Sequence, residues 1–195
     1  MEGPHRLLLF TLLVAILLHF ARSDDTDDKL LEGINSYRTS LNLSKLTTND
    51  NAYCLADEIA KQFKGQPCTN TTGSNTVLGT EEQFPNYPEF LKTCHLNATV
   101  TQDAAIMPAC VPNLDSTLVL TNFTKSQYSG SLNDSKYVAA GVADEGDWIV
   151  VVLSTNTPTG NFETTYTGVS SAVKVDFGYY MFLVFAAFLL YVQYL

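Results

Sequence analysis

Two uncharged apolar segments bracket this chain and limit its folded part to the residues between them. The first covers residues 7–20, follows a short stretch with one arginine, and is followed by the small residues Ala21 and Ser23. This is the three-part layout of a secretory signal peptide. The segment is shorter than the roughly 18 to 20 apolar residues that a membrane-spanning helix needs. We therefore predict that residues 1–23 are removed and that the mature chain starts at Asp24.

The second apolar segment is the C-terminal tail, residues 177–195, which carries no charge. A membrane-spanning segment is normally followed by lysine or arginine on the cytoplasmic side. Here the tail is instead preceded by small, polar residues and a short spacer, the signal for transfer to a glycosylphosphatidylinositol (GPI) lipid. We expect the lipid on Ser170, with Gly168 and Ser171 as alternatives, and removal of residues 171–195. The competing interpretation is a tail retained as a transmembrane helix.

All four cysteines lie between the two apolar segments, at Cys54, Cys68, Cys94 and Cys110. An even number after a signal peptide predicts two disulfides. Four cysteines allow three pairings, and the sequence does not choose among them; the nested pairing of Cys54 with Cys110 and Cys68 with Cys94 is our expectation. A zinc site is disfavoured because no pair has the Cys-x-x-Cys spacing and the mature chain has one histidine. No metal or other cofactor is expected.

Five Asn-x-Ser/Thr sequences are candidate N-glycosylation sites, and none has proline in the middle position. Glycan addition requires exposed backbone, so these positions predict surface loops or the ends of elements. The candidate asparagines are Asn42, Asn70, Asn97, Asn122 and Asn133.

The chain is acidic, with a formal net charge of −9. This charge argues against binding to nucleic acid, whose phosphates favour basic surfaces. It also argues against electrostatic attraction to anionic lipids. We therefore expect the contact with the outer leaflet of the plasma membrane to come from the GPI lipid, and the protein to lie on the extracellular face.

Apolar periodicity predicts helices in the first half of the mature chain. Residues 28–43 form an amphipathic helix, and a second helix begins at an Asn49 or Asp50 cap and ends near Lys64. Short helices are predicted over residues 88–94, where Pro88 suits a first turn, and over residues 101–109.

The second half favours strands over residues 117–123, 137–143 and 148–154, the last two joined by a turn in which Gly146 adopts positive φ. Because residues 148–154 are apolar on both faces, we place them centrally in an antiparallel sheet covered by helices. The fold class is α+β, with one extracellular domain over residues 24–155. Residues 156–170 are rich in threonine and predict a flexible stalk.

The sequence shows no constellation of catalytic residues. The mature chain offers one histidine, His95, which we interpret as an exposed loop residue because general acid–base catalysis needs a positioned partner. We therefore expect a protein that is not an enzyme.

Two stretches resemble the CAP superfamily of secreted domains, which includes plant pathogenesis-related proteins. The first, LLEGINSYRTSLNLSKLTTNDNAYCLADEIAKQF, is similar to the family's Asn-x-x-Arg helix, Leu-x-x-Asn linker and alanine-rich helix. The second, FTKSQYSGSLNDSKYVAAGVADEGDWIVVVLST, is similar to its late Ser-x-x-His segment and two final strands. The resemblance implies an α-β-α sandwich with a small antiparallel sheet flanked by helices.

The departure from the CAP pattern is as informative as the match. Ser129 stands where the family has a histidine that joins acidic residues in a metal-binding cleft, so that chemistry is not carried over. The whole layout looks closer still to a family of plant GPI-anchored glycoproteins. We expect a non-enzymatic domain that binds an unknown extracellular ligand. Sterol or fatty-acid binding in a groove between helices is the alternative that CAP relatives imply, and a hydrolase is a third.

Overall fold

A computed structural model describes residues 24–68 and 86–164 of the chain. The predicted signal peptide, the acceptor Asn70, the attachment residue Ser170 and the apolar tail lie outside these residues. The elements follow in the order α2 (Asp24–Ser40), β1 (Thr47–Thr48), α3 (Asp50–Phe63), α4 (Tyr87–Thr93), η2 (Thr99–Thr101), β2 (Ala105–Cys110), η3 (Pro112–Leu114), α5 (Ser116–Thr124), α6 (Ser129–Leu132), β3 (Tyr137–Glu145) and β4 (Trp148–Thr155).

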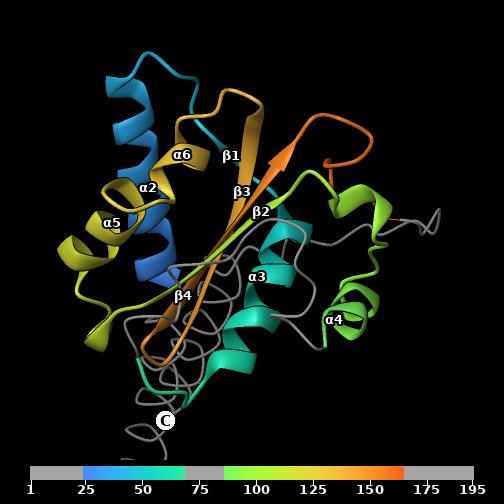
Figure 1. Cartoon of the computed structure of the whole chain (residues 1–195), viewed down its shortest axis with the longest axis horizontal. Helices are drawn as coiled ribbons and strands as arrows, with labels where there is room; N and C mark the ends of the chain where they lie inside the picture. Colours follow the sequence, from blue (N-terminus) through green and yellow to red (C-terminus); the bar gives the residue numbers. More distant parts are fainter. Residues whose placement is uncertain (1–23, 69–85, 165–195) are drawn as a thin grey trace, which may run out of the picture. The chain divides into compact units, whose positions relative to one another are not determined.

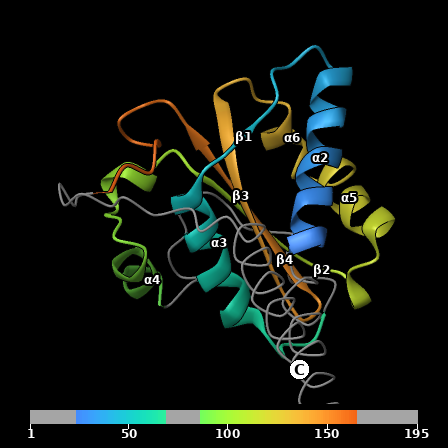
Figure 2. The same ribbon diagram turned by 180° about the vertical axis from the view of Figure 1, so that it is seen from behind.

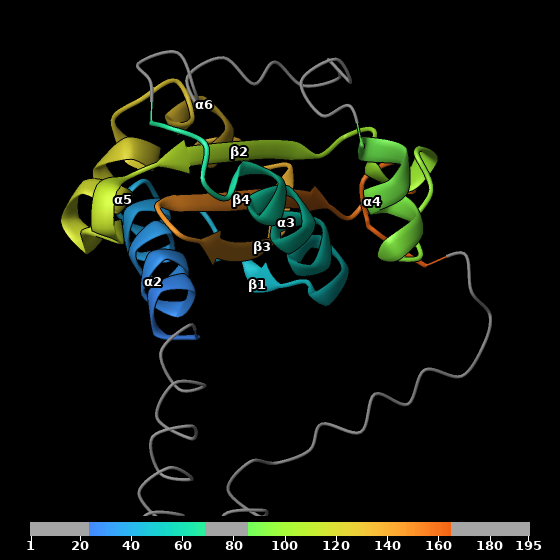
Figure 3. The same ribbon diagram turned by 90° about the horizontal axis from the view of Figure 1, so that it is seen from below.

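A four-stranded sheet in the order β1-β3-β4-β2 forms the middle layer (Figure 1). Strands β3 and β4 form an antiparallel hairpin, β2 pairs antiparallel with β4, and the short β1 pairs parallel with β3. Helices α2 and α5 lie on one side of the sheet, and α3 and α4 lie on the other (Figures 1 and 3). The predicted α-β-α sandwich with its central β4 strand is confirmed.

Strand β4 connects the two layers of core because its side chains alternate between the faces of the sheet. Ile149, Val151 and Leu153 pack with the residues of α2 and α5, whereas Val150 and Val152 pack with those of α3 and α4. All of β4 is buried, which explains why its sequence is apolar on both faces. Gly146 has φ of +67° in the turn before it, as predicted.

Helix α3 packs against the sheet so closely that one position of β3 must be glycine. A Cβ atom at Gly141 would overlap the backbone of Ala52 and Tyr53 in the first turn of α3. That turn is fixed by Asn49, whose Oδ1 accepts hydrogen bonds from the amides of Asn51 at 3.0 Å and Ala52 at 2.9 Å. The predicted Asn49 cap is confirmed, and it places α3 directly over β3.

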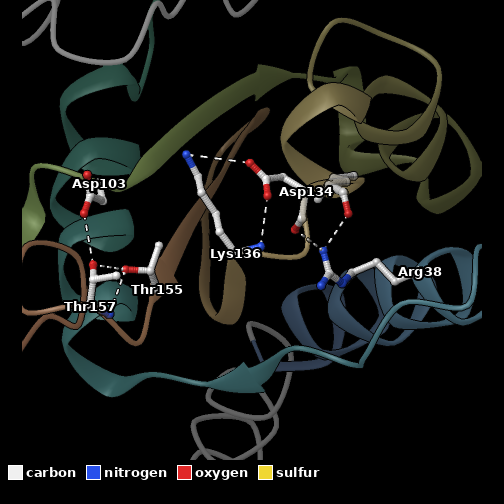
Figure 4. A network of polar contacts seen from close by, with 7 residues as sticks. Arg38, Asp103, Asp134, Lys136, Thr155 and Thr157 are labelled. Carbon is white, nitrogen blue, oxygen red and sulfur yellow. Dashed lines mark hydrogen bonds and ion pairs between the residues drawn. The ribbon is translucent and has the colours of Figure 1, made fainter.

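The residues that resemble the Asn-x-x-Arg motif hold α2 to the chain segments beside it. The amide of Asn35 exchanges two hydrogen bonds with the backbone of Leu46. Arg38 is 1% exposed, and its guanidinium donates to the carbonyl oxygens of Ser44, Leu132, Asp134 and Tyr137 at 2.6–3.2 Å. Figure 4 shows Arg38 beside Asp134. Burial lowers the pKa of Arg38, and the Asp134 carboxylate partly opposes this. The motif is therefore structural here.

Two predicted elements are wrong in type. Residues 101–109 do not form a helix: strand β2 occupies Ala105–Cys110, where alternate side chains enter the core. Pro108 is tolerated there because β2 is an edge strand of the sheet, whereas it would interrupt a helix. Residues 117–123 do not form a strand, because they belong to helix α5.

Helix α5 forms because its local hydrogen bonds override its β-branched composition. The Asp115 side chain caps it by accepting from the amides of Thr117 at 3.1 Å and Leu118 at 3.0 Å. Val119 and Phe123 then fall one turn apart, and both are buried in the core.

The segment after β4, which the sequence assigns to a flexible stalk, is packed against the domain as far as Phe162. The Phe162 side chain is fully buried in the core beside α3. The folded domain therefore extends beyond residue 155 and includes residues 156–162 of the predicted stalk. No helix in the described ranges combines the length and the apolar composition needed to cross a membrane.

Candidate functional site

An open groove of about 620 Å³ runs between α2 and α5. Its volume falls within the roughly 300–1,000 Å³ of sites that hold small molecules. Both walls are helical: residues of the first turns of α2 face residues along the whole of α5, and the two helices lie side by side in Figures 1 and 2. The groove therefore depends on α5 being a helix, because its residues reach the groove at helical spacing.

The groove has an apolar floor and a rim of hydroxyl and ammonium groups. Buried and half-buried side chains of the floor come from Leu30, Leu114, Val119 and Leu120. The polar lining consists of Thr26, Lys29, Ser116, Thr117, Thr121, Thr124 and Lys125.

The charge of the groove lining is opposite to that of the chain. Lys29 and Lys125 are the charged residues that line it, and no carboxylate of the described residues does so, although the chain has a formal net charge of −9. An apolar floor with a cationic rim is suited to a ligand that has an apolar body and an anionic group.

A second, smaller cavity of about 110 Å³ lies between α2, α3 and β3. Asp27, Asp28 and Asp50 contribute carboxylates to its lining. Its volume is below the usual range of small-molecule sites. Within the described part of the chain, no group of three or more histidine, cysteine or acidic residues is arranged to hold a metal ion.

The carboxyl group of Asp144 shares a hydrogen bond with the side chain of Asp27, which lines this cavity. The sequence did not predict this contact between two acidic residues. Burial raises the pKa of the Asp144 carboxyl, the hydrogen bond with the Asp27 side chain lowers it, and the charge of Glu145 raises it again. Burial is the dominant cause, so the pKa lies above its ordinary value. Adjacent acidic residues at the end of a strand are typical of solvated surface, and the packing of α2 against β3 partly buries this one.

The two disulfides join Cys54 to Cys94 and Cys68 to Cys110. The expected nested pairing is therefore wrong, and the observed pairing is interleaved. The reason is the position of α4, which packs against α3 so that Cys94 at its end meets Cys54. Cys68 follows the end of α3 and reaches Cys110, which lies opposite Trp148 at the end of β2.

Four of the five candidate glycosylation asparagines are described, and all four reach the surface. Asn42 follows α2, Asn122 lies near the end of α5, and Asn133 follows α6. All three are exposed. Asn97 is half-buried, and its Oδ1 accepts from the amides of Thr99 and Val100. Their modification stays a prediction.

His95, the one histidine of the predicted mature chain, and Ser129, which occupies the position of the CAP pattern's histidine, come from opposite ends of the domain. His95 follows α4 and its C-terminal cap Cys94, and it is exposed. Ser129 begins α6, and its hydroxyl donates to the Ser126 carbonyl at 2.7 Å. Helices α4 and α6 lie far apart in Figures 1 and 3, so the fold does not bring these two residues together.

Solved structures of two bacterial proteins are similar to this chain at low sequence identity. An extracellular protein with an SCP domain from Bacillus anthracis matches with a TM-score of 0.51 and 16% identity, over 67% of this chain and 40% of that one. A cysteine-rich secretory protein from Staphylococcus aureus matches with a TM-score of 0.46 and 15% identity, over 68% of this chain and 38% of that one. The first similarity confirms the CAP-like fold and shows nothing further.

Closer similarity is found at the level of sequence. The family model described as "Uncharacterized GPI-anchored protein At5g19230-like domain" matches residues 27–153. The Arabidopsis thaliana protein described as "Uncharacterized GPI-anchored protein At3g06035" is 63% identical over 159 residues, which are 81% of this chain and 80% of the relative. Both descriptions agree with the predicted location on the outer face of the cell membrane. The chain therefore belongs to the At5g19230-like family of GPI-anchored proteins.

Proposed function

We propose that this member of the family is a GPI-anchored extracellular glycoprotein whose domain binds a ligand in the groove between α2 and α5 and does not catalyse a reaction. The lipid joins Ser170 and holds the protein on the outer leaflet, and glycans join the five candidate asparagines. The ligand is extracellular, and neither a cofactor nor a nucleic acid takes part.

The groove is the observation that carries this proposal. It has the volume of a small-molecule site. Its floor is apolar, and its charged residues, Lys29 and Lys125, have the sign opposite to the net charge of the chain. A ligand with an apolar part and an anionic part gains contacts with both.

Binding without catalysis is supported by the positions of His95 and Ser129. A general base must lie within hydrogen-bond reach of the proton that it removes. His95 is on the surface after α4, whereas the hydroxyl of Ser129 is already committed to the Ser126 carbonyl at the start of α6. A hydrolase would need another base.

A second candidate, sterol or fatty-acid binding, is favoured by the apolar floor of the same groove. The two lysines distinguish the two lipids, because an ammonium group pairs with a carboxylate and a sterol has none. Among lipids, the groove therefore suits a fatty acid better than a sterol.

The test is the thermal stability of the protein after release from cells by phosphatidylinositol-specific phospholipase C. A ligand at a hundred times its Kd adds about 2.7 kcal/mol to the free energy of unfolding. About 1 kcal/mol moves the unfolding midpoint of a domain of this size by roughly 2–4 °C. Panels of fatty acids, sterols and anionic extracellular small molecules are compared.

Two variants on the same helix locate the binding. Thr121→Phe places a ring in the groove and should abolish the stabilisation. Leu118→Phe places a ring on a face of α5 that is 53% exposed and outside the groove lining, and it should leave the stabilisation unchanged. Stabilisation that survives Thr121→Phe would exclude this groove, and stabilisation by neutral sterols in preference to fatty acids would contradict the role of the lysines.

A further inference from the structure

The segment after β4 is fastened to the domain by a cluster of hydroxyl groups around one carboxylate. Thr157 and Thr159 donate hydrogen bonds to Asp103 Oδ2 at 2.9 and 2.5 Å. The amide of Asp103 donates to the Thr159 carbonyl at 2.9 Å. Figure 4 shows Asp103 facing Thr157, with Thr155 beside it. These bonds hold the segment against the start of β2.

The following residues are fixed against the beginning of α3. The Phe162 side chain is fully buried. Its amide donates to the Val100 carbonyl at 3.2 Å, and its carbonyl accepts from Asn51 Nδ2 at 2.8 Å. Glu163 and Thr164 are the first exposed residues after it. The chain therefore leaves the domain at a defined place, beside the first turn of α3 and the η2 helix.

The link from this exit to the lipid is short. Ser170 follows Thr164 by six residue steps, and six extended residues span at most about 22 Å. With Ser171 as the attachment residue, the reach is about 25 Å. A link of this length keeps the exit close to the anchor, while the rest of the domain is positioned by its rigid connection to the exit.

We infer that the exit end of the domain, formed by the first turn of α3, by η2 and by residues 163–164, faces the headgroups of the outer leaflet. This inference rests on the proposed attachment near Ser170. The described chain ends on the side of the sheet opposite α5 in Figures 1 and 3. The groove between α2 and α5 therefore lies at the end away from the membrane, where it is open to extracellular ligands.

The position of the exit determines this orientation, and surface charge does not. Asp50 and Glu163 give the exit end negative charge, so it has no attraction to anionic lipids. The orientation follows from the short link and from the bonds that keep residues 157–162 on the domain. A longer link should therefore abolish it without any change in the domain.

The experiment measures energy transfer from the protein to the membrane surface. The full-length protein is purified with its lipid anchor and reconstituted in phosphatidylcholine vesicles that carry acceptor dyes on their headgroups. A donor dye is attached through a genetically encoded reactive amino acid at position 163 or at position 118, both of which are exposed. A matched variant for each label carries a Gly/Ser insertion of about thirty residues after Thr164, long enough to act as a flexible coil.

Transfer from position 163 should be at least about twofold more efficient than from position 118, since the short link limits the distance of the exit from the lipid. The insertion should bring the two efficiencies close together. Equal transfer without the insertion, or stronger transfer from position 118, on vesicle-bound protein would overturn the inference. Protein that does not bind vesicles and resists the phospholipase on cells would instead show that the proposed GPI attachment is wrong.

Discussion

Replacement of Arg38 should destabilise the domain more than replacement of any exposed cation. Its guanidinium joins α2 to the chain before β1 and to the stretch from the end of α6 to the start of β3, through four carbonyl oxygens. The bonds to Leu132 at 2.6 Å and to Tyr137 at 3.0 Å are buried. Arg38→Met retains most of the apolar stem but leaves these acceptors without the donor.

The magnitude follows from the number of buried bonds. Each buried acceptor that loses its partner costs about 1–3 kcal/mol, so the two buried bonds together with the two partly buried ones predict a loss of about 3–5 kcal/mol for Arg38→Met. Arg38→Lys keeps the charge but replaces the planar fork by one ammonium group, and it should cost about 2 kcal/mol. Lys45→Met, at an exposed position, is the matched control and should cost less than about 0.5 kcal/mol.

Urea unfolding with the disulfides intact measures these differences. Trp148 is the only tryptophan. It is 1% exposed and stacked on Phe63 with ring centroids 4.4 Å apart, so its fluorescence reports loss of the core. A loss below about 1 kcal/mol for Arg38→Met, or a loss equal to that of Lys45→Met, would refute the structural role of the motif.

Three further predictions concern Asp144, the two disulfides and Gly141. Because burial raises the pKa of Asp144, the stability that this carboxyl contributes to the domain is highest at low pH, where it is neutral, and declines as the pH rises through the raised pKa. Asp144→Asn should remove this decline and raise the melting temperature at about pH 8 but not at about pH 4. The same difference in melting temperature between variant and wild type at both pH values would contradict this prediction. Mild reductant should open Cys68–Cys110 before Cys54–Cys94, since Cys68 is exposed and Cys94 is buried. Alkylation of the freed thiols, mapped by mass spectrometry, measures the order of opening, and the reverse order would contradict this prediction. Gly141→Ala should lower the free energy of unfolding by about 3 kcal/mol or more, because α3 must move to make room for the methyl group. Gly130→Ala, with open space around it, is the control and should be tolerated. Equal melting temperatures of the two variants would show that α3 is not in close contact with β3.

The parts of the fold that were predictable carry their signals in neighbouring residues. The Asn49 cap and the apolar stripe behind it identify α3, and the turn at Gly146 between two apolar runs identifies the β3–β4 hairpin. Residues 117–123 are rich in β-branched side chains and predict a strand, but the Asp115 cap and the one-turn spacing of Val119 and Phe123 produce a helix.

The groove and the disulfide pairing were not predictable because both arise from tertiary contacts. The groove forms because Lys29 and Leu30 of α2 face α5. The local composition of α5 predicts a strand, so the sequence did not indicate this helix. The pairing of Cys54 with Cys94 needs α4 to dock on α3, and nothing in the spacing of the cysteines requires this. Phe162 similarly enters the core from a segment whose threonine-rich composition predicts a stalk.

GPI attachment is tested by the mass of the C-terminal peptide of the mature protein purified from membranes. Attachment at the expected residue gives a peptide that ends at Ser170 and carries the ethanolamine phosphate of a GPI lipid. A peptide that ends at Gly168 or Ser171 with the same modification would move the attachment residue but still support the GPI anchor. A mature protein that still contains Leu195 would contradict the GPI attachment on which the extracellular function and the orientation of the groove depend.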